Sequence, residues 1–210
     1  MALANYTDLK NSVANWLHRS DLTANIPDFI TMAEVRLARD LRVSPLITSG
    51  AVTIAAAGNS IALPTGMMEV VKVKIASTGQ ELQYVPPDTI DRLGTAAGTP
   101  WIYTLIGGNI QVAPSWTAGG NLTVLYVKKE TALSDSTTTN WYITNAPDAL
   151  LYASLLEASP YLMNDNRVVV WKEFYKNSIE GINGQYGTVD PHKRMLAMQS
   201  GGQASNLNAG

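Results

Sequence analysis

The hydrophobic period changes twice along the chain, and this order restricts the fold more than any other feature. Residues 1–45 carry apolar side chains every three or four positions, which predicts two amphipathic helices. Their stripes are Tyr6, Leu9, Val13, Trp16 and Leu17, then Ile26, Phe29, Ile30, Ala33, Leu37 and Leu41. Residues 46–140 instead alternate β-branched residues with Gly, Pro and Asn, which is typical of short antiparallel strands. The helical period returns in residues 141–187.

The two predicted helical pairs lie at opposite ends of the chain, and neither pair covers its own apolar stripe. We therefore expect the stripes to close on each other. The predicted fold class is α+β: a four-helix bundle formed by residues 1–45 and 141–187, with residues 46–140 inserted as an antiparallel β-domain. Residues 188–210 have too few apolar side chains to form a core, so we expect an extended, flexible C-terminal tail.

Turn signals within residues 46–140 predict which strands are neighbours. One predicted β-hairpin turns at Gly58-Asn59 and joins strand residues Val52, Ile54, Ile61 and Leu63. A second turns at Gly107 to Asn109 and joins Tyr103, Leu105, Ile110 and Val112. Two further strands are expected at residues 67–75 and 122–127, and a brief helix at residues 86–93.

Capping residues predict the limits of the last two helices. Asn145 is the predicted N-cap of a helix with the stripe Leu151, Leu155, Ala158 and Leu162, which Pro160 should kink or shorten. Asp165 is predicted to cap the final helix, whose face comprises Val168, Trp171, Tyr175, Ile179 and Ile182. Gly184 and Gly187 are predicted to end it.

The charge balance argues against tight binding to nucleic acid. The 15 Lys and Arg residues and 17 Asp and Glu residues leave a net charge of −2, which offers no basic field for counterion release. The chain has no cysteine, which excludes disulfides and thiolate metal sites. We find no secretory signal pattern and no apolar run near the ~20 residues of a membrane span, so we expect no membrane partner.

The sequence contains no motif that identifies a catalytic residue, a metal ligand or a cofactor site. The sequence lacks the phosphate-cradle, zinc-helix and nucleophile-elbow motifs. The only histidines, His18 and His192, are interpreted as a helix-end and a surface residue. Asp88 and Asp91 lie beside Arg92 at a spacing more typical of a solvated helix turn than of a catalytic carboxylate pair. We therefore expect no enzyme.

Without a catalytic or metal site, we expect the function to depend on surfaces that contact other molecules. Arg36 and Arg39 lie on one flank of the segment from Glu34 to Asp40, which we interpret either as an exposed ion-pair face or as a subunit contact. In the tail, Met195, Leu196 and Met198 are the candidate apolar anchors for a partner.

The chain has 5 Trp and 9 Tyr residues but only 2 Phe, a composition that suits interfaces. Trp16 and Trp171 lie on predicted core stripes and are assigned to packing. For Trp101, Trp116 and Trp141, which flank strands and turns, core and interface remain equally good interpretations.

Four groups of residues, in this order, carry a family resemblance. They are ANWLHRSDLTANIPDFITMAEVRLARDLRV; Leu63-Pro64 with MMEVVKV; LQYVPPDTIDRL with GTPWIYTLIGGNIQVAPSW; and NWYITNAPDALLYASLLEASPYLMNDNRVVVWKEFY. Together they span roughly residues 7–182 and resemble phage adaptor proteins, the head-to-tail connector subunits beneath the portal of short-tailed phages and related viruses.

The resemblance implies a structural virion protein that forms a homo-oligomeric ring of twelve copies. Such a ring extends the portal channel and docks the tail, so the implied partners are the portal protein and tail or nozzle proteins. Double-stranded DNA would pass through the lumen without specific binding. The implied location is the head-tail junction of the virion, with assembly in the host cytoplasm.

Two functions from other classes remain open. A carbohydrate- or receptor-binding tail module would use the β-region through Trp101, Trp116 or Tyr103. A tail-associated hydrolase would use Asp88, Asp91 or Glu81.

Overall fold

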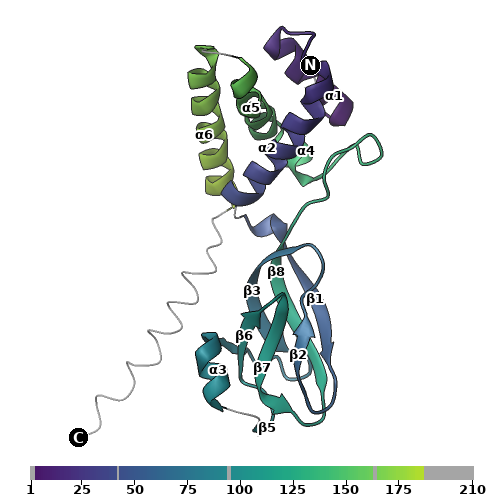
Figure 1. Ribbon diagram of the computed structural model, residues 1–210, viewed down its shortest axis with the longest axis vertical. Helices are drawn as coiled ribbons and strands as arrows, with labels where there is room; N and C mark the ends of the chain where they lie inside the picture. Colours follow the sequence, from purple (N-terminus) through teal and green to yellow (C-terminus); the bar gives the residue numbers. More distant parts are fainter. Residues whose placement is uncertain (1–2, 42, 94–95, 163–164, 187–210) are drawn as a thin grey trace, which may run out of the picture. The chain divides into compact units, whose positions relative to one another are not determined.

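The computed structural model describes residues 3–41, 43–93, 96–162 and 165–186. In these ranges the chain is a mixed α+β protein that divides into two compact units (Figure 1). The helical unit comprises the described parts of residues 1–45 and 129–189, and the β unit comprises residues 46–128. The predicted tail anchors Met195, Leu196 and Met198, and also His192, lie outside the described residues.

The helical unit is built from segments at both ends of the chain. Its helices are α1 (Tyr6–Leu17), α2 (Ile26–Asp40), α4 (Trp141–Asn145), α5 (Pro147–Glu157) and α6 (Arg167–Tyr186), with short 3₁₀ turns η1 (Thr23–Asn25) and η3 (Ser159–Tyr161). A further 3₁₀ turn, η2 (Ser44–Leu46), leads into the strands. The two predicted N-terminal helices are confirmed, and Asn5 begins the first by accepting a hydrogen bond from the Asp8 amide.

Helix α5 lies at the centre of the helical unit. Helices α1, α2 and α6 all contact it. Its buried side chains cover the whole circumference rather than one stripe: Ala149, Leu150, Leu151, Ala153, Ser154, Leu155 and Leu156. The one hydroxyl among them, on Ser154, donates a hydrogen bond of 2.7 Å to the Leu150 carbonyl and is therefore satisfied.

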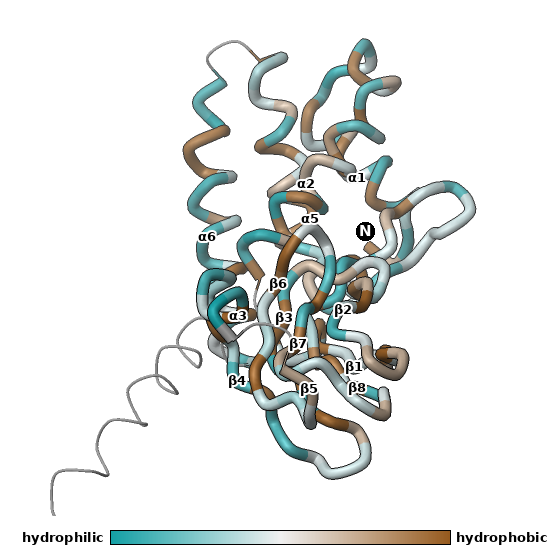
Figure 2. The backbone as a smooth tube through the Cα atoms, turned by 60° about the horizontal axis from the view of Figure 1, so that its bottom comes forward, coloured by the Kyte–Doolittle hydropathy of each residue, from teal (hydrophilic) through white to brown (hydrophobic). Residues whose placement is uncertain are grey.

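Helix α6 has one buried face, as its sequence predicts. Trp171, Tyr175 and Ile182 are buried and Val168 and Ile179 are half-buried. Figure 2 shows hydrophobic and hydrophilic stretches alternating along this helix, which is the pattern of a helix that covers a core on one side only.

Two predicted helix limits are wrong. Asn145 does not cap a helix; it is the last residue of α4, and Asn140 is the N-cap there, accepting a hydrogen bond from the Ile143 amide. Helix α5 instead begins at Pro147 after Ala146, without a side-chain cap. Gly184 does not end α6, because an exposed glycine within a packed helix lowers stability without stopping the helix. The predicted shortening at Pro160 is confirmed, since α5 ends at Glu157.

The β unit contains two sheets and one short helix. The first sheet has the order β1-β8-β3 and is antiparallel; its strands are β1 (Ile47–Ile54), β8 (Gly120–Lys128) and β3 (Met67–Ile75). The second has the order β2-β7-β6-β4, with β2 (Gly58–Ala62), β7 (Asn109–Trp116), β6 (Ile102–Ile106), β4 (Gln83–Tyr84), and β5 (Ala97–Gly98) beside β7. Helix α3 (Pro87–Leu93) confirms the predicted brief helix.

The predicted purely antiparallel arrangement needs a correction in the second sheet. Strand β4 pairs with β6, and β5 with β7, in the parallel sense. The other pairs are antiparallel. A cluster of side chains from both sheets forms the core of this unit, with Ile54, Val73, Ile75, Tyr103, Ile110, Val112, Leu122 and Val124 among its members.

One of the two predicted hairpins is confirmed and the other is wrong. Strands β6 and β7 pair from Ile106 opposite Asn109, and Gly107 and Gly108 between them both have positive φ, as a tight two-residue turn requires. Strands β1 and β2 do not form a hairpin, because β1 pairs with β8 and β2 pairs with β7. The chain crosses from one sheet to the other at this corner, and the positive φ of 57° falls on Ala57.

Candidate functional site

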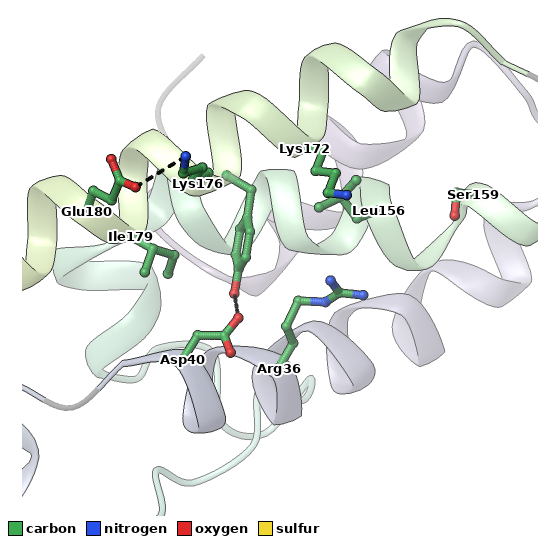
Figure 3. A pocket seen from close by; sticks show the side chains of 9 residues that line it. Arg36, Asp40, Leu156, Ser159, Lys172, Lys176, Ile179 and Glu180 are labelled. Carbon is green, nitrogen blue, oxygen red and sulfur yellow. Dashed lines mark hydrogen bonds and ion pairs between the residues drawn. The ribbon is translucent and has the colours of Figure 1, made fainter. Parts of the chain in front are cut away.

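A groove on the helical unit lies between α2, the end of α5 and α6. It encloses about 570 Å³ and is lined by Arg36, Asp40, Leu156, Ser159, Lys172, Tyr175, Lys176, Ile179 and Glu180 (Figure 3). Arg36 and Asp40 are one turn apart on α2, so both side chains reach the same groove. The ring of Tyr175 enters it from α6, with the Arg36 guanidinium 5.9 Å from the ring centroid.

Polar contacts in this groove connect the three helices to one another. The Arg36 guanidinium donates to the Glu157 carboxylate at 2.6 Å, and the Tyr175 hydroxyl donates to Asp40 at 2.6 Å. Burial, reinforced by the bond to Asp40, raises the pKa of the Tyr175 hydroxyl above its ordinary value, so this group stays a donor. Glu180 and Lys176 pair with each other along α6 at 3.6 Å. The first two contacts join α2 to α5 and to α6, whereas the Lys176–Glu180 pair stays within one helix.

On the predicted flank of the second helix, now α2, the residues Glu34, Arg36 and Arg39 have three different environments. Arg36 forms its ion pair with α5 of the same chain, whereas Arg39 is exposed and donates only to the Val35 carbonyl, at 3.2 Å, among the bonds of the described residues. Glu34 is not part of an exposed ion-pair face; it is buried, and that interpretation is wrong for this residue. Its place on the helix turns the carboxylate toward the segment that returns from the β unit.

The Glu34 carboxylate anchors this returning segment to α2. It accepts hydrogen bonds from the Leu133 amide at 3.1 Å and from the Asn140 side chain at 2.6 Å. Burial raises the pKa of Glu34 above its ordinary value, although both hydrogen bonds oppose the shift. Asn140 also caps α4, so one buried carboxylate orders the segment and positions the helix that follows it.

A row of aromatic rings crosses the helical unit from α1 to α6. Trp16 contacts Tyr152 edge-on at 5.9 Å between ring centroids, and Tyr152 contacts Phe174 at 5.3 Å. The predicted burial of Trp16 is wrong, because its side chain is 39% exposed at the margin of the α1 stripe. The prediction for Trp171 is confirmed, since it is 2% exposed and lies under the Arg167 guanidinium at 5.2 Å.

Arg167 joins the start of α6 to the end of α1. It donates to the Trp16 carbonyl at 2.9 Å, which satisfies one of the last carbonyls of α1, and it pairs with Asp165. His18 is the C-cap of α1 in the left-handed conformation, as expected of a helix-end histidine.

In the β unit, the tryptophan candidates differ in exposure. Trp101 is 48% exposed, whereas Trp116 is packed in the core and has little surface to offer a partner. Of the carboxylates of the hydrolase alternative, Glu81 pairs with Lys72 at 2.6 Å, whereas Asp88 and Asp91 are exposed on α3.

Neither a metal-ion cluster nor a membrane-spanning helix occurs in the described residues. No group of three or more His, Cys, Asp or Glu side chains there is arranged to hold a metal ion. No helix in those ranges combines the length and apolar character needed to cross a membrane.

Exposed apolar side chains on α2 and α6 are the remaining surface feature, and they include Met32, Val35, Val169, Val170 and Phe174. Exposed apolar side chains that gather on a surface are typical of contacts with other protein chains. The outer surface of α2 and α6 is therefore the candidate site of this α+β protein, and it is a binding surface rather than a catalytic one. Comparison with protein families matches residues 4–195 to the family described as SU10 adaptor protein.

This match covers nearly the whole chain, and the chain belongs to this family of phage adaptor proteins. The resemblance seen in the sequence is therefore confirmed. The match also extends beyond residue 182, where the resemblance ended, into the first part of the tail. A comparison with curated proteins finds no match.

Proposed function

We propose that the chain is one subunit of a ring that sits beneath the phage portal, extends its DNA channel and docks the tail. The observation that carries this proposal is the family match over residues 4–195. The exposed apolar side chains of α2 and α6 support it, because a ring subunit buries such surfaces against its neighbours.

In this proposal each predicted segment has a task. The helical unit, with α1, α2, α5 and α6 as its bundle, forms the ring body, the β unit (residues 46–128) forms the inserted domain, and residues 188–210 bind the portal. Twelve copies close the ring at the head-tail junction of the virion, after assembly in the host cytoplasm. A net charge of −2 suits a conduit, because a weakly charged lining lets the duplex pass without holding it.

The tail is the segment proposed to bind the portal, and a matched pair of variants tests it. Replacing Met195, Leu196 and Met198 by Ser removes the apolar anchors, and we expect portal binding to fall at least ~10-fold, given the affinity carried by three buried apolar side chains. The control replaces Gln203, Asn206 and Asn208 by Ser in the same tail and should bind normally. Equal portal binding by both variants, measured by pull-down with the portal from the same genome, would refute this role.

A second candidate function has one observation in its favour, the exposed indole of Trp101 in the β unit. An exposed tryptophan can stack on a sugar ring as well as dock a protein. Binding of glycan arrays by the full chain, lost in Trp101→Ala and kept in Ile106→Ala, would favour a carbohydrate-binding tail module.

A further inference from the structure

We propose that the outer face of α2 binds the outer face of α6 of a second copy of this chain. This inference rests on the proposed ring and specifies its subunit contact. We define the α2 face as Met32, Val35 and Arg39, and the α6 face as Val169, Val170, Glu173 and Phe174.

The α2 face combines two apolar side chains with the guanidinium of Arg39, which has no carboxylate partner among the described residues. Met32 is 54% and Val35 43% exposed, on the side of the helix opposite the buried Ala33 and Leu37. Arg39 follows Val35 by one turn and, within the described residues, has no carboxylate partner. A second chain that covers this face therefore needs apolar side chains and, one turn further along, an anion.

The α6 face has this complementary composition. Val169 is 71% and Val170 49% exposed, and Phe174 beside them is 41% exposed. Glu173 follows Val169 by one turn, is exposed, and forms no ion pair with the described residues. On each helix the apolar side chain and the charge are four residues apart, a rise of about 6 Å. Val35 can thus face Val169 while Arg39 faces Glu173, provided that the two helices run in the same direction.

Contacts with α5 show that α2 and α6 run in the same direction within one subunit. Along α2, Phe29 contacts Tyr161 just beyond the end of α5, and the later Arg36 pairs with Glu157. Along α6, Phe174 contacts Tyr152, and the later Ser178 donates to Asp148 near the start of α5. Both helices are therefore antiparallel to α5 and parallel to each other. Figure 1 shows the same sense for both helices. Rotation about an axis near this direction preserves it, so α2 of one copy and α6 of the next remain parallel. Two different faces that meet in this way form a head-to-tail contact, the kind that closes into a ring.

The absence of cysteine in the chain allows a direct test by cross-linking. The variant Val35→Cys/Val169→Cys, assembled with the portal and oxidised, should give a ladder of covalent multimers beyond the dimer on a non-reducing gel. The control Val35→Cys/Ile106→Cys places the second thiol on the β unit, where it does not face Val35 of the neighbouring copy, and should remain a monomer on the gel, as should Val35→Cys alone. Equal ladders for the two double variants, or no ladder from an assembled ring, would overturn the contact.

A charge exchange provides a second test that does not depend on thiol geometry. Arg39→Glu or Glu173→Arg alone sets like charges against each other, and we expect the protein concentration needed for assembly to rise ~10-fold or more. Both changes in one chain restore the opposite charges and should bring assembly back to within about threefold of the original. A double variant as defective as the single ones refutes the pairing. If the unsubstituted chain forms a ring that ignores these changes, only the contact is wrong; if it forms no ring even with portal, the proposed function fails as well.

Discussion

Replacing the buried Glu34 by Ala tests whether one carboxylate holds the returning segment to α2. The substitution leaves the Leu133 amide without its acceptor and removes a charge-assisted bond from Asn140. A stranded buried amide costs about 2 kcal/mol and the bond to Asn140 contributes about 1–2 kcal/mol. Relief of the burial penalty on the charged carboxylate offsets part of this loss. We expect the free energy of unfolding to fall by about 2 kcal/mol.

Urea unfolding followed by circular dichroism at 222 nm measures this loss, because the signal reports mainly the helices. Glu180→Ala is the matched control, since Glu180 lies in the same unit in an exposed ion pair and should lose at most about 0.5 kcal/mol. Glu34→Gln keeps one acceptor oxygen and should fall between the two. If Glu34→Ala unfolds at the same urea concentration as the control, the anchoring role of Glu34 is refuted.

Two further predictions concern pH and backbone geometry. Because the pKa of Glu34 is raised above 4.5 in the folded state, its contribution to stability is full below that pH and is lost as pH rises through the folded pKa. The stability of the unsubstituted chain relative to Glu34→Gln should therefore be greater at pH 4 than at pH 7, and a flat or opposite difference would contradict the buried carboxylate. Gly119→Ala should destabilise the β unit by at least about 2 kcal/mol, because a Cβ there would lie 2.7 Å from the Ile54 carbonyl oxygen in addition to the strain of a positive φ. Gly66→Ala has the same strain in open space and should lose only about 1 kcal/mol; equal losses in thermal unfolding would show that the close approach is unimportant.

The sequence predicts elements whose signals are local. The β6–β7 hairpin follows from Gly107 and Gly108, which suit a two-residue turn, and the face of α6 follows from its helical spacing. The pairing of β1 with β8 could not be predicted, because paired residues such as Ile47 and Val127 are far apart in sequence. Their register depends on which side chains the folded sheet buries, and this is not a local signal.

The candidate site was only partly visible in the sequence. Glu34 was missed as an anchor, although its position between Ala33 and Leu37 on the apolar stripe of α2 gave the signal, since a carboxylate there is buried and needs donors. The predicted burial of Trp16 was wrong because its spacing places it at the edge of the apolar stripe of α1, where a large indole remains partly exposed. The sequence offers no local signal that distinguishes Arg36 from Arg39. In the fold, Glu157 of α5 lies beside Arg36, which therefore forms an internal ion pair, whereas Arg39 stays exposed.

The proposed function depends above all on the assembly of this chain into a ring on the portal. Light scattering coupled to size exclusion measures it most directly, on the purified chain alone and after mixing with the portal from the same genome. We expect a complex that carries about a dozen copies of the chain in at least the mixed sample, as closed cyclic assembly requires. A monomer that stays unchanged in the presence of portal would refute the proposed ring.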